Sequence, residues 1–486
     1  MRWILWSRDG VTGPAEPVRA EQPTLEQRRT RVDAGTADRS ARRDAPTNRA
    51  ARPHTTARHH PRAASPNPAT TDPGDVNEII DARRVDVVFQ AIVDVERDQV
   101  VGFEALTRGP EGPLSNPAEL FAAARAIGRA GELDWICRAL AFRKFLDAKL
   151  PGSMSLFVNV EPDSLIAPCP EDLLETVWEA EAQLRVFVDL PGRALSRHPR
   201  EVLETVRNAR AARWGISLDD TEFSSAGLSL LPVVEPDVIR LHHSVLTSGA
   251  AGTAAAISAA ISATAQTGAS LLLEKVEERE ASRLGLSIGA TFQQGHLFAR
   301  EQPLPAVVPA PLRPVRLLER TYDDIDSPHA IVTESVPEAG RVMQAEGVDL
   351  ITLSLVRQAT AINPVPVIAA MLPAAADLFP LTSHRSFRTL LERAPLALLL
   401  GSAAHRFETW NTEVTTLAPD HPLSDELCLL LLGPSGTTVL TAAPAPGEPQ
   451  GRWTVTTSQD PGICRRVMHQ MLRVIDSKDE SLRATG

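Results

Sequence analysis

Polar residues recur at the points where apolar, strand-length runs of this sequence end. They are Glu104, Asn159, Asp189, Asp219 with Asp220, Arg240 with His242, Glu274 with Glu277, and Gln294. When parallel strands close into a barrel, their carboxyl ends converge on one mouth, and such folds place their active sites there. Carboxylate oxygens gathered at one mouth bind hard cations, and the bound cations bind phosphate groups. The pattern therefore predicts a site for cation and phosphate chemistry.

The apolar runs alternate with helical patterns, which indicates a repeated strand–helix unit. Strands are expected at residues 87–93, 100–107, 155–161, 185–190, 215–220, 237–242, 269–276 and 289–294. Helices are expected at residues 116–128, 134–150, 170–182, 199–214 and 253–268. The strand runs are continuously apolar, as they are when helices cover a parallel sheet. The whole region of strands and helices, residues 77–312, approaches the ~250 residues of a typical (β/α)8 barrel. The fold class is therefore α/β, with a TIM-like (β/α)8 barrel.

Composition divides the chain into four parts. Residues 1–76 are rich in Arg and Pro without a hydrophobic period, so they are predicted to form a disordered tail. Residues 77–312 carry the barrel pattern, and the Pro-rich joint LPAVVPAPLRPVR leads into a linker at 313–324. Residues 325–486 are predicted to form an α+β domain. Its helices are expected at 336–347, 364–379 and 462–477, and its strands at 396–402, 426–433, 437–443 and 451–458.

The overall composition argues against several classes of protein. A net charge of −11 argues against nucleic acid as the main partner. No apolar run approaches the ~20 residues that a membrane helix needs, and the opening MRWILW is too short for a secretory signal. The four cysteines show neither CxxC nor zinc-site spacing, which indicates the reduced thiols of a cytoplasmic protein.

Seven sequence segments of the barrel region resemble those of one known family. In chain order they are FQAIVD, VVGFEALTRGPEGPL, SLFVNVEP, GISLDD, EPDVIRL, LEKVEERE and QQGHLFAR. Their order and approximate spacing are similar to those of EAL domains, the family of cyclic-di-GMP phosphodiesterases and cyclic-di-GMP receptors. The segments HPLSDELCLLLLGP and FRTLLERAPLALLLGS resemble the DICT domain, a sensory module. The resemblance implies a signalling protein whose partner is cyclic-di-GMP.

The resemblance also implies roles for the strand-end residues. In active EAL enzymes two divalent ions, Mg²⁺ or Mn²⁺, activate the water that opens cyclic-di-GMP to linear pGpG. The implied metal ligands are Glu104, Asn159, Asp189, Asp219 and Asp220. The implied catalytic residues are Glu274 and, at the position of the family's lysine, Arg240. The implied ligand-binding residues are Gln90, Leu106, Arg108, His242, Glu277 and Gln294.

Several positions depart from the family pattern. Asp189 stands for a glutamate, Arg240 for the catalytic lysine and His242 for an acid. Lys275 occupies the glycine position of the EGVE element, and the loop after the paired aspartates reads DTEFSSAGLSL instead of the family's glycine-rich sequence. An arginine stays charged and is bulkier and planar, so it is a poor replacement for a lysine that orients a water. These departures weaken the predicted second-metal and water-activating groups.

Three functions are compatible with this pattern. The departures favour a regulator whose barrel binds cyclic-di-GMP or a protein partner, coupled to the sensory module. An active, metal-dependent cyclic-di-GMP phosphodiesterase is the alternative, and a scaffold that binds no nucleotide is the third. The sequence identifies neither the ligand of the C-terminal domain nor the oligomeric state.

Overall fold

The protein is described from a computed structural model. It describes residues 73–483, apart from 163–164, 166, 220–224, 248–250, 319–326, 363–364, 374–384, 403, 410, 434–435 and 450. The expected disordered tail falls almost entirely outside the described residues. Helix α1 (Pro73–Asp81) begins within the last residues assigned to that tail.

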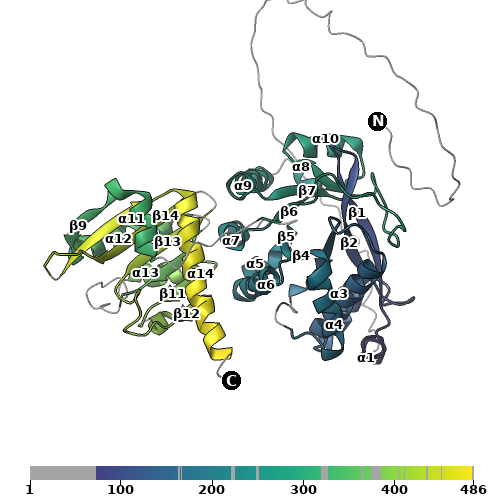
Figure 1. The fold of residues 1–486 in the computed structure, drawn as a ribbon, viewed down its shortest axis with the longest axis horizontal. Coiled ribbons are helices and arrows are strands. Elements are labelled where there is room, and N and C mark those ends of the chain that lie inside the picture. Colours follow the sequence, from purple (N-terminus) through teal and green to yellow (C-terminus); the bar gives the residue numbers. More distant parts are fainter. Residues whose placement is uncertain are drawn as a thin grey trace, which may run out of the picture. The chain divides into compact units, whose positions relative to one another are not determined.

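Eight strands form a closed barrel in chain order (Figure 1). They are β1 (Asp86–Asp94), β2 (Gln99–Arg108), β3 (Ser155–Asn159), β4 (Arg185–Pro191), β5 (Gly215–Asp219), β6 (Val238–His242), β7 (Ser270–Glu274) and β8 (Phe292–Gln294). Each of the eight runs expected from the sequence overlaps one of these strands. The predicted fold class, an α/β protein with an eight-stranded barrel, is confirmed.

One strand of the barrel runs against the other seven, contrary to the expected parallel arrangement. Strand β1 pairs antiparallel with both β2 and β8, whereas the remaining neighbours are parallel. Only residues 95–98 connect β1 to β2, which is far too short for the helical crossover that parallel strands need. The Asp94 side chain accepts hydrogen bonds from the backbone N–H groups of Glu96 and Arg97 in this turn. As a result, Gln90 reaches the mouth from the middle of its strand, where it pairs with Glu104.

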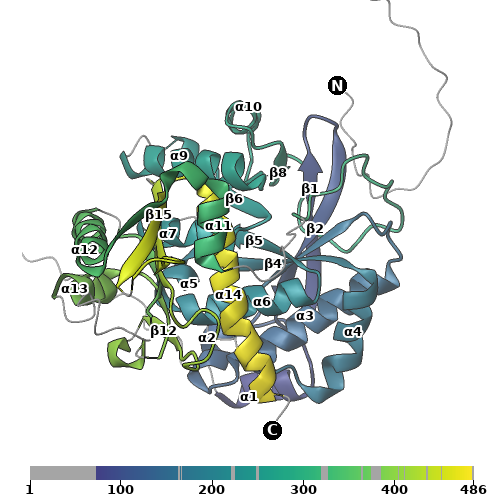
Figure 2. The same ribbon diagram turned by 60° about the vertical axis from the view of Figure 1, so that its left-hand side comes forward.

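Helices cover the outside of the barrel (Figures 1 and 2). They include α2 (Pro117–Ala126), α3 (Ala130–Asp147), α4 (Leu174–Gln183), α5 (Gly192–Arg197), α6 (Pro199–Ala211), α7 (Ser225–Val234), α8 (Ser244–Thr247), α9 (Ala251–Thr267) and α10 (Arg279–Ser287). Asn116 caps α2 by accepting a hydrogen bond from the Ala118 N–H, and Pro117 fills the first helical position.

An apolar layer fills the barrel one step below the polar mouth. Its side chains come from Phe157, Phe187, Val238, Leu272 and Phe292, and the rings of Phe157 and Phe187 stack with centroids 4.7 Å apart. Side chains two residues apart on a strand share a face. Each of these positions is therefore followed, two residues later, by a polar side chain on the same inner face. The barrel interior is therefore a packed core, and its charged and amide side chains gather at the carboxyl ends of the strands.

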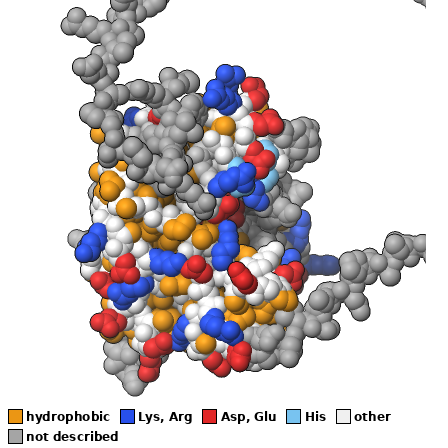
Figure 3. Space-filling view, turned by 90° about the vertical axis from the view of Figure 1, so that its right-hand side faces the viewer, with side chains coloured by type: hydrophobic (Ala, Val, Ile, Leu, Met, Phe, Trp, Pro, Cys, Tyr) orange, Lys and Arg blue, Asp and Glu red, His pale blue; other side chains and the backbone are white. Residues whose placement is uncertain are grey.

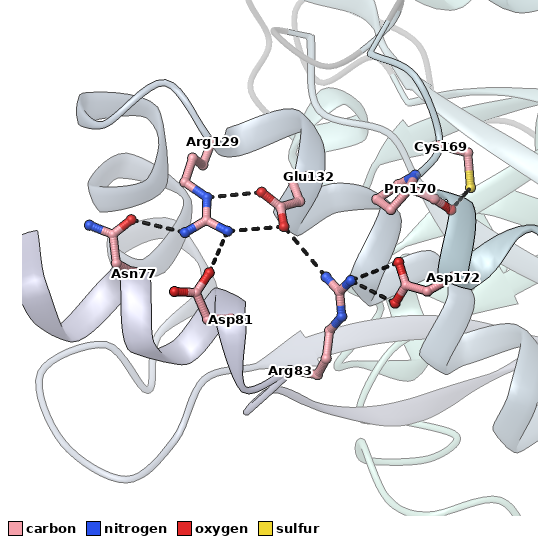
Figure 4. Close-up of polar contacts among 8 residues, drawn as sticks. All are labelled: Asn77, Asp81, Arg83, Arg129, Glu132, Cys169, Pro170 and Asp172. Carbon is pink, nitrogen blue, oxygen red and sulfur yellow. Dashed lines mark hydrogen bonds and ion pairs between the residues drawn. The ribbon is translucent and has the colours of Figure 1, made fainter.

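Helix α1 is tied to the barrel helices by a chain of ion pairs (Figure 4). Arg129 donates to Asp81 of α1 at 2.7 Å and to both oxygens of Glu132. Arg83, just after α1, reaches Glu132 and makes a two-pronged contact with Asp172 at 2.7 and 3.0 Å. This network, called here the α1 clasp, fixes the segment that leads into β1.

The C-terminal part forms a mixed seven-stranded sheet in the order β12-β11-β10-β13-β14-β15-β9. The strands are β9 (Arg341–Gln344), β10 (Val367–Met371), β11 (Ala397–Leu400), β12 (Thr412–Thr415), β13 (Leu427–Gly433), β14 (Gly436–Pro444) and β15 (Arg452–Ser458). The principal helices are α11 (Pro328–Ser335), α12 (Ala345–Ala361), α13 (Arg385–Arg393) and α14 (Pro461–Arg483). The four strands expected near the end of the chain and the closing helix are present.

Two helices expected in this domain are wrong. Within residues 336–347 the chain forms the edge strand β9 before α12 begins. The described part of 364–379 forms the interior strand β10, and residues 364 and 374–379 lie outside the described residues. Strand β10 is buried along its whole length because it lies between β11 and β13. An alanine-containing apolar run of this kind suits a buried helix and a buried central strand equally, and strand pairing decides the outcome here.

Residues 71–486 form one compact unit, and an ion-pair cluster links the barrel to helix α14 within it. Glu235, which follows α7 and is 3% exposed, lies 2.9 Å from His469 Nε2 and 3.6 Å from Arg465 Nε. None of the described helices is both long enough and apolar enough to cross a membrane. On the face shown in Figure 3, acidic and basic side chains are interspersed among apolar ones.

Candidate functional site at the mouth of the barrel

A buried arginine lies at the centre of the mouth. Arg240 of β6 is 2% exposed, and its Nη2 lies 3.0 Å from a carboxylate oxygen of Glu104 on β2 and 3.0 Å from one of Glu274 on β7. Its Nη1 pairs with Asp189 on β4. One guanidinium therefore contacts three carboxylates that come from three different strands. These four residues are called the Arg240 cluster.

Amide side chains complete the hydrogen bonding around Glu104. Asn159 donates to Glu104 Oε1 at 3.1 Å, and Gln294 donates to Glu104 Oε2 at 2.6 Å. Gln294 also donates to Gln90 Oε1 at 3.0 Å and accepts from Arg240 at 3.3 Å. The structure thus brings together residues from β1, β2, β3, β6 and β8 that the sequence placed at one mouth.

The charges in this cluster stabilise each other. Burial raises the pKa of Glu104, but the positive charge of Arg240 and the hydrogen bonds from Asn159 and Gln294 outweigh it and hold that pKa below its ordinary value. Burial likewise disfavours the charged form of Arg240, but the carboxylates of Glu104 and Glu274 raise its pKa above the ordinary value. Both groups are therefore ionised at neutral pH.

The described residues do not fit a divalent ion. Mg²⁺ and Mn²⁺ need several carboxylate or carbonyl oxygens that converge on one point. In this mouth the carboxylates of Glu104, Asp189 and Glu274 converge on the guanidinium of Arg240 instead. No group of three or more His, Cys, Asp or Glu side chains within the described ranges is arranged to hold a metal ion. The metal ligands implied by resemblance stay a prediction, and Asp220 among them lies outside the described residues.

A groove opens beside the Arg240 cluster, over the ends of β2, β3, β4 and β5. Its volume is about 430 Å³, and Leu106, Arg108, Asn159, Glu161 and Asp219 are among its lining residues. Arg108 is partly exposed there, and its Nη1 donates to the backbone oxygen of Thr107 at 2.9 Å. The groove therefore combines a guanidinium with apolar, amide and carboxylate surface, and the guanidinium of Arg108 is its group for pairing with an anion.

The other predicted site residues lie at the edge of the mouth. His242, at the end of β6, accepts a hydrogen bond at Nδ1 from the backbone N–H of Ser244 at 3.1 Å. Its pKa is lowered by partial burial and then by the positive charges of Lys275 and His243, which Glu274 opposes. Glu277 is exposed in the loop after β7.

Sequence reasoning missed a buried ion pair behind the groove. Asp134 and Arg138 lie one helical turn apart on α3, are almost fully buried and pair at 2.7 Å. Asp134 accepts from the backbone N–H of Glu161 at 3.4 Å, and the Arg138 guanidinium lies 3.6 Å from the Trp135 ring centroid. The pair thus supports the loop after β3. The i, i+4 spacing of opposite charges was the available signal, although it is typical of exposed helix faces as well.

Comparison with known proteins finds one family that is similar to the barrel region. Residues 74–301 match the model of the EAL domain. No curated protein matches the chain. Among solved structures, the chain is similar to Klebsiella pneumoniae BlrP1 in a manganese and cy-diGMP complex, with 26% identity, 45% of this chain and 56% of that chain covered, and a TM-score of 0.40. The chain thus spans little more than half the length of BlrP1.

Two further solved structures are similar over the same region. The PaMucR phosphodiesterase in a c-di-GMP complex is 19% identical, with 47% of this chain and 96% of that chain covered and a TM-score of 0.41. The EAL domain of Mycobacterium smegmatis DcpA is 20% identical, with 45% and 93% covered and a TM-score of 0.37. On the family match, residues 74–301, a little under half of this chain, are similar to EAL domains.

Proposed function

We propose that this chain is a cyclic-di-GMP signalling protein whose barrel binds the nucleotide without hydrolysing it. The observation that carries the proposal is the position of the Arg240 guanidinium among Glu104, Asp189 and Glu274. Two-metal hydrolysis needs Glu104 and Asp189 as ligands of cations that activate a water, and Glu274 as a catalytic group beside them. In this mouth a fixed side-chain cation already neutralises part of their charge, and a guanidinium cannot lower the pKa of a bound water as a metal does.

Binding is supported by the groove beside the cluster. Its volume of about 430 Å³ lies within the range of small-molecule sites, and Arg108 places a charged fork among apolar groups. Arginine recognises phosphate through two parallel hydrogen bonds, so Arg108 would hold one phosphodiester of the cyclic dinucleotide. A concave site of this kind favours a nucleotide over a flat protein partner.

Coupling to the C-terminal domain is part of the same proposal. The DICT-like character of that domain suggests signal input, and the Glu235 contact with His469 and Arg465 offers a physical link between barrel and domain. A change in the barrel that moves the segment after α7 would alter this buried contact.

An active phosphodiesterase is the second candidate. The strand-end positions of Glu104, Asn159, Asp219 and Glu274 favour it, because each stands where the family pattern places a catalytic or metal-binding group. This candidate requires Arg240 to leave the carboxylates when metal binds. Removing a guanidinium from three buried partners is costly, which counts against it.

Isothermal titration calorimetry with cyclic-di-GMP in EDTA tests the binding proposal. Saturable binding by the wild type, weakened at least about tenfold in Arg108→Ala, is the expected result. Arg143→Ala is the matched control, because that arginine pairs with Glu179 on the outer helices and is 43% exposed. Absence of binding both in EDTA and in Mn²⁺ would overturn the proposal and leave a scaffold.

A further inference from the structure

The backbone at Lys275 has a conformation that suits glycine. Its φ is 52°, in the left-handed region, where the Cβ of an ordinary residue lies too close to the following carbonyl oxygen. Lys275 directly follows the last residue of β7, at the mouth of the barrel. A strained residue in such a place persists only when the surrounding structure determines its geometry.

Hydrogen bonds on both sides of Lys275 fix this conformation. The backbone oxygen of Glu274 accepts from His243 at 3.1 Å, and the backbone N–H of Val276 donates to the oxygen of Gln294 at 2.9 Å. Val276 is also held by the approach of Gly295, where an added Cβ would meet the Val276 backbone at 2.2 Å. The chain must therefore turn sharply at position 275, whatever residue stands there.

Lys275 supplies an exposed positive charge at this edge of the mouth. Its side chain is solvent-exposed, whereas the charge of Arg240 is buried and shared among three carboxylates. Lys275 lies near enough to His242 for its charge to disfavour the protonated imidazole. Arg108, at the end of β2, provides a second cation on the other side of the mouth.

We propose that Lys275 is a ligand-contacting residue that pairs with a phosphodiester of the cyclic dinucleotide at the β7 edge of the mouth. This inference rests on the proposed binding function. A cyclic dinucleotide carries two phosphodiesters on opposite sides of its ring, and among the described residues Arg108 and Lys275 are separated cations at the mouth. A lysine ammonium is a compact point charge that suits the outer, hydrated phosphate, while the arginine fork suits the phosphate in the groove.

The chain contains a closely matched control for both the charge and the backbone. Lys149, between α3 and β3, is also exposed and has a φ of 49°. It precedes β3 and so lies at the opposite end of the barrel from the mouth. Replacing either lysine with glycine relieves the same backbone conformation, and replacing either with methionine removes the same charge.

Calorimetry with cyclic-di-GMP at low and high salt tests the inference. We expect Lys275→Met and Lys275→Gly to weaken binding about fivefold at low salt, with a smaller difference at 0.5 M salt. Lys149→Met and Lys149→Gly should bind as the wild type does, and all four variants should keep the wild-type thermal midpoint within a few degrees.

The outcomes separate this inference from the proposed function. If the wild type binds cyclic-di-GMP and both Lys275 variants bind equally well, Lys275 is not a ligand contact and the proposed function stands. If the Lys149 variants lose as much affinity as the Lys275 variants, the loss comes from the change in the net charge of the protein, and the inference is wrong. If the wild type does not bind, the proposed function itself has failed.

Discussion

The Nη2 atom of Arg240 lies 3.0 Å from Glu104 Oε2, although their strands, β6 and β2, are not neighbours in the barrel. The arginine side chain therefore crosses the mouth and joins opposite sides of it. The branched guanidinium contacts Glu104 and Glu274 through Nη2 and Asp189 through Nη1, whereas a lysine would meet the same carboxylates from one compact ammonium. The contacts of the Arg240 cluster therefore depend on having an arginine at position 240.

Arg240→Met should destabilise the folded protein strongly. Removing the guanidinium leaves three buried carboxylates without their cation, and breaking a buried ion pair in this way costs about 3–5 kcal/mol of unfolding free energy. Urea denaturation at pH 7 measures the change. Arg283→Met is the control, because that arginine is 75% exposed and pairs with an exposed glutamate, so its loss should cost less than about 1 kcal/mol. Equal effects in the two variants would show that the Arg240 cluster does not exist in solution.

The pH dependence of stability should change sign in the same variant. The pKa of Glu104 is lowered in the folded protein, so Glu104 contributes stability above its ordinary pKa of about 4.5, and this contribution is lost as the pH falls through the lower folded value. In Arg240→Met burial should raise the pKa of Glu104 above its ordinary value instead. As the pH falls, Glu104 would then be protonated in the folded state at a higher pH than in the unfolded state. The unfolding free energy of Arg240→Met should therefore increase as the pH falls from 7 to 5. Urea titrations at each pH would measure this change. A wild-type pH profile in the variant would contradict this explanation.

Divalent metals should have little effect on the nucleotide affinity and the thermal midpoint of the wild type. EDTA is expected to leave the affinity for cyclic-di-GMP unchanged, and Mn²⁺ should not raise the thermal midpoint, because the guanidinium already occupies the carboxylates. In Arg240→Lys the smaller head group frees carboxylate oxygens, so Mn²⁺ should raise the midpoint by several degrees. Loss of wild-type binding in EDTA would show that a metal is part of the native site.

The α1 clasp should make a modest contribution to stability. Arg129 is 26% exposed and contacts Asp81 and Glu132, so Arg129→Ala is expected to cost about 1 kcal/mol of unfolding free energy. Arg84→Ala is the matched control, since its pair with Glu78 is mostly exposed and should contribute only a few tenths of a kcal/mol. Salt at 1 M should reduce the difference between the two variants. If both variants lose the same amount, the network in Figure 4 acts as separate surface pairs.

Much of the barrel follows from local sequence, because several site residues stand two positions after an apolar residue on the same strand face. Phe187 and Asp189, or Leu272 and Glu274, show this register directly. The direction of β1 could not be predicted in that way, since a continuous apolar run is the same in both directions. The strand β10 was taken for a helix for a related reason: its burial comes from neighbours that are distant in the sequence.

The composition of the mouth was also predictable, but its contacts were not. Strand ends placed Glu104, Arg240 and Glu274 at one edge, and resemblance indicated that Arg240 replaces a lysine. No local pattern shows that a long side chain spans the mouth and pairs with β2, because this depends on barrel closure. The strain at Lys275 was indicated only by its place at the family's glycine position, because the backbone hydrogen bonds that fix it are made by residues 243 and 294.

The most direct test of the central claim is a single-turnover assay of the wild type with cyclic-di-GMP and Mn²⁺, with the protein in excess and nucleotides separated by chromatography. The Arg240 cluster predicts that intact cyclic-di-GMP is recovered under conditions in which calorimetry shows it to be bound. Formation of pGpG by the wild type, abolished by Glu104→Ala, would contradict it and establish the chain as an active phosphodiesterase.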